Sequence, residues 1–324
     1  MNIPSLQELC ATHSVTGDTQ NVIRLLAAKL KKRGISSEIS SYGVLLFGNR
    51  KNPKVLVSAH ADEIGFMVSK KNDDGTFLVN KSGIVGPTQL NNSHVYVETH
   101  KGKIYGFFYP KLELGSNNPE SFQETFLDTI DNNAVQVGDF GSYMRVFEKN
   151  KEKVIATGLD NKAGVELVLE LVEENPELLK STLFSFVTEE EASYDCIAGV
   201  AHRFSPEYAM VVDMFPVNHI SKGKVEQMAV LGKGPAVLLG MGGAYHLHET
   251  IRKKLDSVKV SYQTAIVDIP FPPEPQILQR NGITKGMNIF IPMLGWHDGA
   301  YTMNINDFEQ SKKFTLAMHR TLIK

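Results

Sequence analysis

The chain has 324 residues and a formal net charge of −2, and its hydrophobic content of 42% is ordinary for a globular protein. This length exceeds what one core usually organises, so we expect one large domain and a smaller one. The near-neutral charge argues against a nucleic-acid partner. Two cysteines, Cys10 and Cys196, exclude a disulfide framework and a cysteine zinc site and favour a reducing compartment. The first ten residues lack a signal-peptide pattern, and no apolar run reaches the ~18 residues of a membrane span, so we expect a cytoplasmic protein without membrane contact.

The N-terminal part combines a helix with strands. Residues 21–33 carry apolar side chains at helical spacing and end in a basic run before Gly34, which predicts an amphipathic helix. The segments 37–41, 43–47 and 54–58 alternate in the manner of strands.

A possible metal ligand follows the third of these strands, in the segment AHADEIG. His60 and Asp62 are two residues apart and project from the same face if the strand continues. Asp62 could then hold the second nitrogen of a metal-binding His60 and fix its tautomer. A purely structural histidine is the alternative.

The character of the sequence changes between residues 66 and 154. Glycine and asparagine are frequent, and the apolar runs are short: 76–80, 94–99, 103–108 and 141–147. This pattern predicts a small all-β domain inserted into an α/β chain. We expect this domain to serve in assembly and in shaping the active-site cleft. We assign structural roles to His94 and His100 within it.

Asp160 precedes a strongly apolar helix in the segment ATGLDNKAG. An aspartate in this position commonly caps the helix. Asn161 could supply the cap equally well, which would leave Asp160 available for another role. Gly164 indicates close packing or an open approach.

The segment 182–193, TLFSFVTEEEAS, brings an apolar strand directly to Glu189, Glu190 and Glu191. Carboxylates at close range repel one another and raise each other's pKa, so a positive partner is expected. Two divalent metals would provide it, with one glutamate as ligand and its neighbour as proton carrier. A solvated acidic turn is the alternative.

Two later strands carry further candidate metal ligands. Asp213 lies near the end of an apolar strand, YAMVVDMF, and His297 lies three residues beyond the strand 287–294. A helix is expected at 197–203 between the acidic run and Asp213. His246 and His248 have ligand-like spacing, but no strand-end carboxylate accompanies them, so we assign them to structure or to the cleft wall. The remaining histidines are also expected to be structural: His13, His202, His219 and His319.

The candidate ligands share one location if the strands are mostly parallel, because the carboxyl ends of such strands meet at one edge of a sheet. They are His60, Asp160, Glu190, Asp213 and His297. Nitrogen and oxygen ligands without cysteine suit Zn²⁺, Co²⁺ or Mn²⁺ in a hydrolytic site. Five ligands for two metals require one carboxylate to bridge.

The ordered set of motifs resembles the dinuclear metallo-aminopeptidases that assemble as tetrahedral dodecamers, which include glutamyl and deblocking aminopeptidases. The resemblance covers nearly the whole chain and is carried by SAHADEIGFMV, GLDNKAG, FVTEEE, the strand at Asp213, and His297. It implies a zinc-exopeptidase-like α/β fold with a mostly parallel or mixed sheet flanked by helices. A catalytic domain would comprise residues 1–65 and 155–324, and residues 66–154 would form a β-barrel-like dimerisation domain.

The resemblance also implies roles for individual residues. Asp160 would bridge two divalent metal ions, which the resemblance implies to be zinc, with cobalt or manganese as alternatives. His60 and Asp213 would complete one metal site, and Glu190 and His297 the other. Glu189 would be the general base toward the attacking water, and Asp62 would orient His60.

Two segments depart from the family pattern. Residues 267–278 read VDIPFPPEPQIL where the family carries Gly-Gly-Thr-Asp-Ala, and His297 lies in GWHDGA rather than Tyr-x-His-Ser. Glu274 is the only charge between residues 271 and 278 and could meet the α-amino group or a basic first side chain of a substrate.

The expected function is removal of N-terminal residues from short peptides by a homo-oligomer, as dimers or a dodecamer. One alternative is hydrolysis of an N-acyl amino acid or another small amide. A second is a catalytically silent assembly or binding protein on the same fold.

Overall fold

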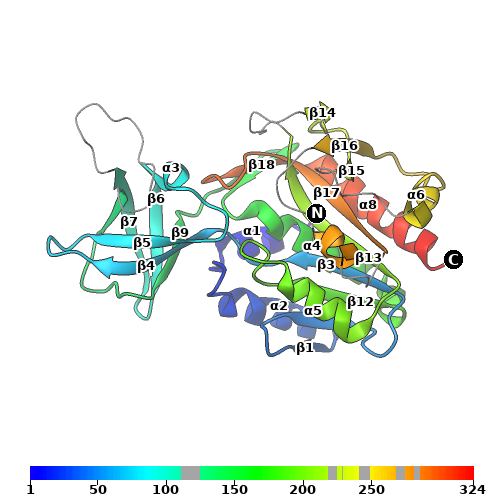
Figure 1. Ribbon diagram of the computed structural model, residues 1–324, viewed down its shortest axis with the longest axis horizontal. Coiled ribbons are helices and arrows are strands. Elements are labelled where there is room, and N and C mark those ends of the chain that lie inside the picture. Colours follow the sequence, from blue (N-terminus) through cyan, green and yellow to red (C-terminus); the bar gives the residue numbers. More distant parts are fainter. Residues whose placement is uncertain (111–124, 218–224, 228, 241–248, 268–273, 281–284) are drawn as a thin grey trace.

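The computed structural model describes the chain except for residues 111–124, 218–224, 228, 241–248, 268–273 and 281–284 (Figure 1). Its larger part contains a mixed sheet. In chain order, the strands along the main path of this sheet are β1 (Ser37–Ile39), β2 (Leu45–Gly48), β3 (Val55–His60), β12 (Thr182–Val187), β13 (Tyr208–Pro216), β14 (Val225–Gln227), β15 (Ala236–Gly240), β16 (Gln263–Val267) and β17 (Lys285–Leu294). Their order in space is β1-β2-β12-β3-β13-β17-β15-β16-β14.

Four adjacent strands at the centre of this sheet are parallel: β12, β3, β13 and β17. Val187 of β12 pairs with His60 of β3, and Ser58 of β3 pairs with Val211 of β13. The carboxyl ends of these strands therefore lie along one edge, as the sequence predicted. Asp213 lies inside β13 rather than at its end, because this strand continues to Pro216.

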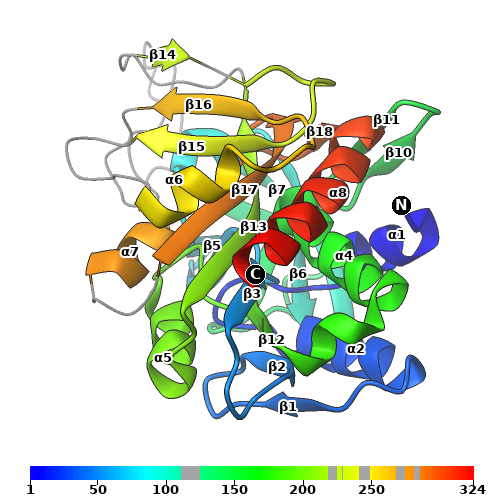
Figure 2. The ribbon, with the colours of Figure 1, turned by 90° about the vertical axis from the view of Figure 1, so that its right-hand side faces the viewer.

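Helices cover both faces of the sheet (Figure 2). One face packs on apolar side chains from α1 (Ile3–Ala11), α2 (Gln20–Lys32), α4 (Leu159–Glu174), α6 (Glu249–Leu255) and α8 (Ile305–Leu322). The other packs on α5 (Asp195–Phe204) and α7 (Glu274–Arg280). A short 3₁₀-helix, Pro176–Lys180, connects α4 to β12. The predicted helices at 21–33 and 197–203 correspond to α2 and α5.

A small closed barrel projects from the larger part (Figure 1). Its strands are β4 (Gly65–Lys71), β5 (Phe77–Ser82), β6 (His94–Thr99), β7 (Gly102–Pro110), β8 (Thr125–Thr129) and β9 (Phe140–Tyr143), with the short helix α3 (Pro87–Leu90) beside them. Phe66, Phe77 and Phe108 lie in its own core. Gly141 is required there, because a Cβ atom would lie 2.4 Å from the ring of Phe66.

The barrel agrees with the predicted insertion of a small β domain, but the expected strand 141–147 divides in two. β9 ends at Tyr143, and β10 (Phe147–Lys149) pairs with β11 (Lys153–Ala156). β11 in turn pairs with β18 (Tyr301–Asn304), which pairs with β17. These strands extend the large sheet and connect it to the barrel.

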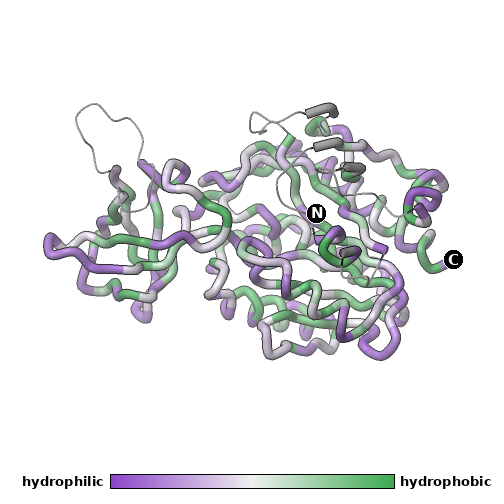
Figure 3. Tube along the Cα trace, viewed as in Figure 1, coloured by the Kyte–Doolittle hydropathy of each residue, from purple (hydrophilic) through white to green (hydrophobic). Residues whose placement is uncertain are grey.

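Hydropathy follows this division of the molecule. Figure 3 shows hydrophobic stretches along the central strands and hydrophilic residues at the tips of the barrel hairpins. Among the helices that the structure describes, none is long and apolar enough to span a lipid bilayer.

Candidate metal centre

Six side chains gather at the carboxyl edge of the parallel strands in two groups of three. One group is His60, Glu190 and Asp213, and the other is Asp160, Glu191 and His297. Within each group, the potential ligand atoms all lie within 4.8 Å of one another. The structure thus brings together all five residues that the sequence indicated as ligands and adds Glu191 to them.

His60 reaches Asp213 because of strand register. Ser58 pairs with Val211, so the residues two positions further on project from the same face of neighbouring strands. Nε2 of His60 lies 3.3 Å from Oδ1 of Asp213. Two atoms that are each about 2.0–2.1 Å from one tetrahedral Zn²⁺ lie about 3.3 Å apart, so this spacing fits two ligands of one ion.

Asp160 lies between the two groups. It belongs to the group of His297, yet its Oδ1 atom is 3.5 Å from Nε2 of His60. This Oδ1 atom is buried and has no hydrogen-bond partner among the described residues. A carboxylate in this position can contact a cation on either side, which fits the bridging role that the resemblance implies.

The helix start leaves Asp160 available in the way the sequence suggested. Asp160 and Asn161 have non-helical backbone angles inside the first turn of α4. Oδ1 of Asn161 accepts a hydrogen bond from the backbone N–H of Gly164 at 3.0 Å, which is the capping contact. A Cβ atom on Gly164 would lie 2.2 Å from that oxygen, so only glycine fits.

The three consecutive glutamates point to different surroundings. Glu189 is exposed and belongs to neither group, and its Oε2 atom lies 3.7 Å from Sγ of Cys196. Glu190 joins His60, whereas Oε2 of Glu191 lies 3.3 Å from Nε2 of His297. The resemblance instead implied that Glu190 shares a metal with His297 and that Glu189 is the base. The alternation of strand β12 ends at Val187, and a left-handed φ of 86° at Glu189 then redirects the chain.

Asp62 contacts both groups. Its Oδ1 atom lies 3.4 Å from Nδ1 of His60. Its Oδ2 atom accepts hydrogen bonds from the hydroxyl of Thr16 at 2.7 Å and from the backbone N–H of Glu191 at 3.2 Å. One carboxylate thus orients the imidazole of one group and the backbone of the other.

The site holds more negative than positive charge. Burial raises the pKa of both Glu190 and Glu191 well above the usual range, and neighbouring carboxylates, among them Asp213 and Asp160, raise it further. Burial opposes a charge on His60, but Glu190, Asp160 and Asp213 outweigh it and raise its pKa well above the ordinary value. Divalent cations would compensate this excess, so the residues present fit a pair of such ions.

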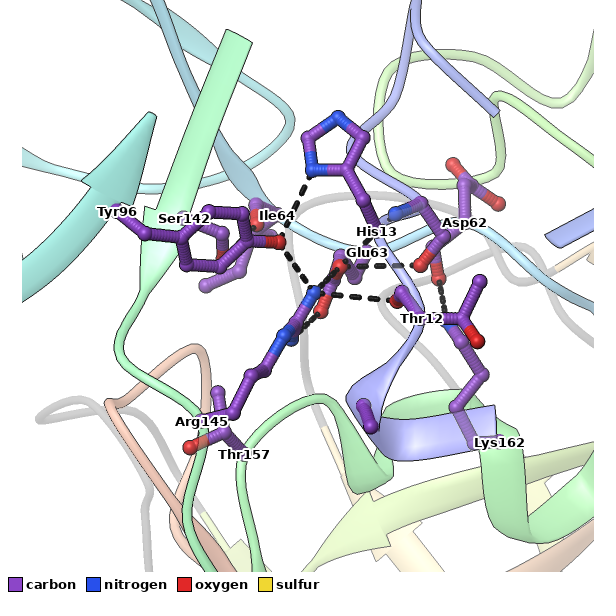
Figure 4. Close-up of polar contacts among 12 residues, drawn as sticks. Thr12, His13, Asp62, Glu63, Ile64, Tyr96, Ser142, Arg145, Thr157 and Lys162 are labelled. Carbon is purple, nitrogen blue, oxygen red and sulfur yellow. Dashed lines mark hydrogen bonds and ion pairs between the residues drawn. The ribbon is translucent and has the colours of Figure 1, made fainter. Parts of the chain in front are cut away.

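A buried ionic network supports the segment that follows β3 and carries Asp62 (Figure 4). Nη1 of Arg145, which follows barrel strand β9, donates to Oε2 of Glu63 at 2.6 Å. Nζ of Lys162 donates to the carbonyl oxygen of Ala61 at 2.7 Å. These supporting residues were not predicted from sequence, although Glu63 and Lys162 lie within the HADEIG and DNKAG motifs. Nothing in the sequence around Arg145 indicates its role.

Glu274 also lies at this site. Burial raises its pKa to about 8, with a further contribution from Asp213. The part of its proline-rich segment that precedes it, residues 271–273, lies outside the described residues. His219, His246 and His248 also lie outside them. Within the described residues, neither metal-type group includes His13, His94, His100, His202 or His319.

Similarity to known proteins agrees with this geometry. Residues 43–314 match the model of the M42 glutamyl aminopeptidase family. The chain is 30% identical over 260 residues to the FrvX protein of Escherichia coli (strain K12), covering 74% of this chain and 72% of that protein. It is 24% identical over 238 residues to the glutamyl aminopeptidase of Lactococcus lactis subsp. cremoris (strain MG1363), covering 67% and 66%.

Solved structures show the same fold. The TET1 peptidase of Pyrococcus horikoshii, described as able to assemble into a tetrahedron or a large octahedral shell, superposes with a TM-score of 0.84 at 21% identity. The superposition covers 98% of both chains. With the family match extending over most of the chain and the two ligand groups in place, the chain belongs to the M42 glutamyl aminopeptidase family and is a metal-dependent aminopeptidase.

Proposed function

We propose that this aminopeptidase removes N-terminal residues from short peptides with two divalent cations per chain, most consistent in ligand type with zinc. The observation that carries the proposal is Asp160, which belongs to the group of His297 and also lies 3.5 Å from His60 of the other group. Two cations sharing one carboxylate would explain why so many acidic groups are buried together. Cobalt and manganese suit the same nitrogen and oxygen ligands.

The proposed ligands follow from the distances. His60 and Asp213 would hold one cation, Glu191 and His297 would hold the other, and Asp160 would bridge. This assignment moves the ligand role in the acidic run from Glu190 to Glu191, because Glu191 is buried and lies 3.3 Å from His297. Asp62 would fix the orientation of His60 and of the Glu191 backbone.

Glu190 is then the best-placed general base, in place of Glu189. Its Oε2 atom lies 3.8 Å from Nε2 of His60, and its side chain retains 15% exposure, while Glu189 is outside both groups. The cations, when bound, supply activation of water and stabilisation of negative charge on the scissile carbonyl. Glu190 would accept the proton of the attacking water and return it to the leaving amine, which balances the hydrolysis.

The two alternatives receive less support. The similar proteins are peptidases rather than N-acyl amino acid hydrolases, and a silent assembly protein would not need Glu190 beside the ligands. A panel of leucyl, lysyl and glutamyl amides, each with a free and an acetylated amino group, tests the function. The proposal requires hydrolysis of the free-amine substrates only, and it fails if the acetylated substrates are preferred.

We further propose that the barrel within residues 66–154 is an assembly domain through which copies of the chain associate. The barrel displays an aromatic row on its outer face: rings of Phe107 and Tyr109 are 4.8 Å apart, and those of Tyr109 and Phe126 are 5.7 Å apart. Tyr109 is exposed, and Phe107 and Phe126 are half-buried, so this row suits a contact with a second copy. The solved TET1 peptidase is described as able to assemble into a tetrahedron or a large octahedral shell, which supports association but does not fix its size here.

We also propose that the protein resides in a reducing compartment. Cys10 and Cys196 are both unpaired thiols and both buried. This pairing state suits a reducing environment such as the cytoplasm.

A further inference from the structure

Glu274 is a buried carboxylate that the ligand assignment leaves unused. Only 2% of the residue is exposed, and its Oε2 atom is buried without a hydrogen-bond partner among the described residues. A buried carboxylate oxygen without a partner is costly, which indicates a group that binds there during function.

Packing places Glu274 on the same face of the sheet as His60 and Asp213. Leu278, one helical turn after Glu274 in α7, packs in one apolar cluster with Leu56 and Val211. Strand residues two or four positions apart share a face, so Leu56 shares its face with His60, and Val211 with Asp213. Residues four apart on a helix also share a face, so Glu274 points to this side of the sheet.

The electrostatic neighbours of Glu274 place its carboxylate close to the proposed base. Its charge raises the pKa of Glu190 and of the Tyr194 hydroxyl, and Asp213 acts in turn on Glu274. Among the described residues, no basic side chain forms a hydrogen bond or an ion pair with this carboxylate. An ammonium group of a bound molecule would supply the partner that this carboxylate lacks.

We propose that Glu274 binds an ammonium group of the first residue of the substrate and so determines which N-terminal residues the enzyme accepts. This inference rests on the proposed peptidase function and adds the substrate class: peptides whose first residue is neutral or basic rather than acidic. An aminopeptidase substrate carries an α-ammonium group next to the scissile bond, and a lysyl substrate carries a second cation on its side chain. Either group has the charge that Glu274 requires.

The test compares Glu274→Gln with wild type by kcat and KM for leucyl, lysyl and glutamyl amides. The substitution keeps shape and removes the charge, so kcat/KM for the lysyl amide should fall at least about tenfold, mainly through KM. A parallel loss for all three amides identifies the α-ammonium as the bound group. A loss confined to the lysyl amide, with a gain for the glutamyl amide, identifies the side chain.

Glu207→Gln is the matched control, because it also removes one carboxylate but from an exposed pair with Lys285 at the opposite end of β13. It should leave kcat/KM for all three amides unchanged, and Glu274→Asp should restore part of the lysyl activity. Metal content and thermal unfolding of each variant should match wild type.

Three results would overturn the inference while leaving the peptidase function intact: kcat/KM values in Glu274→Gln that equal those of wild type for all three amides, a wild type that prefers the glutamyl amide, or a loss of bound metal that makes Glu274 a ligand. A wild type without turnover would instead contradict the proposed function. Calorimetric binding of L-lysinamide would then still decide the inference, since tenfold weaker binding to Glu274→Gln supports it and equal binding refutes it.

Discussion

Oε2 of Glu191 lies 3.3 Å from Nε2 of His297, and the backbone N–H of Glu191 donates to Asp62, which also contacts His60. Glu191 is thereby held between the two ligand groups by both its side chain and its backbone. Glu190, directly before it, is left beside His60 with part of its side chain exposed. The two neighbouring glutamates therefore have different surroundings, which is the condition for different roles.

The general base can be identified by a glutamine scan of the acidic run. Glu190→Gln should retain both metals but lose on the order of 10²–10⁴ in kcat, because the amide cannot accept the proton of water. Glu189→Gln is the matched control, and its kcat should stay within about threefold of wild type, since its side chain is exposed. Metal content and steady-state hydrolysis of a leucyl amide are the measurements. A large loss in Glu189→Gln with normal Glu190→Gln would restore the assignment made from sequence.

Removal of the bridging carboxylate should affect both metals. Asp160→Ala should lower occupancy of the two sites together, because Asp160 belongs to one group and lies within 3.5 Å of the other. Asp213→Ala should lower occupancy at only one site. Elemental analysis after dialysis against a fixed metal concentration gives the readout. One ion retained at full occupancy in Asp160→Ala would indicate a mononuclear centre.

The Arg145–Glu63 pair should stabilise the junction between the barrel and the large sheet. Both side chains are largely buried, so Arg145→Met would leave an unpaired buried carboxylate and cost about 3–5 kcal/mol in the free energy of unfolding. Glu63→Gln combined with Arg145→Met should recover part of this loss. Urea unfolding at fixed metal and protein concentration measures it, and a single variant within about 1 kcal/mol of wild type would argue that the network contributes little.

The same pair predicts a pH dependence. Burial opposes the charge of Glu63, but Arg145 outweighs it and lowers the pKa of Glu63 from 4.5 to about 2. A carboxyl group whose folded pKa is depressed contributes stability above its unfolded pKa and loses it as the pH falls toward the folded value. The contribution is about 3 kcal/mol at neutral pH. Unfolding free energy should therefore fall between about pH 5 and 2 in wild type, and fall less in the double variant.

Association through the barrel can be tested with one charge on its aromatic row. Tyr109→Glu should reduce the molar mass measured by light scattering at micromolar concentration, because it places a carboxylate in the proposed contact. Tyr42→Glu is the control, since Tyr42 is more exposed and lies on the larger part of the molecule. A monomeric wild type would contradict assembly altogether, and an unchanged mass in Tyr109→Glu would move the contact away from this row.

The fold could be predicted well from sequence because its signals are local. Apolar strands and helical spacing defined β3, β12, β17 and α2 to within a few residues, and the change of character after residue 65 marked the barrel. The gathering of His60, Asp213 and His297 followed from the geometry of parallel strands. The role of Asp160 in the site could be predicted because Asn161 could cap the helix equally well and leave Asp160 available.

The details of the site could not be predicted because they depend on chain direction after the strands end. Three consecutive glutamates offer no periodicity, so the left-handed turn at Glu189, which decides the placement of Glu190 and Glu191, has no sequence signal. Arg145 reaches Glu63 from the barrel across a tertiary contact that no local pattern encodes. The burial of Glu274 likewise depends on how α7 packs against the sheet.

The measurement that tests the central claim most directly is a titration of metal-free protein with Zn²⁺, in which bound metal per chain and hydrolysis of a leucyl amide are followed together. The account predicts that two ions bind per chain and that full activity requires both, because Asp160 connects the two ligand groups. Full activity at one ion per chain, or two bound ions without hydrolysis of any aminoacyl amide, would contradict it.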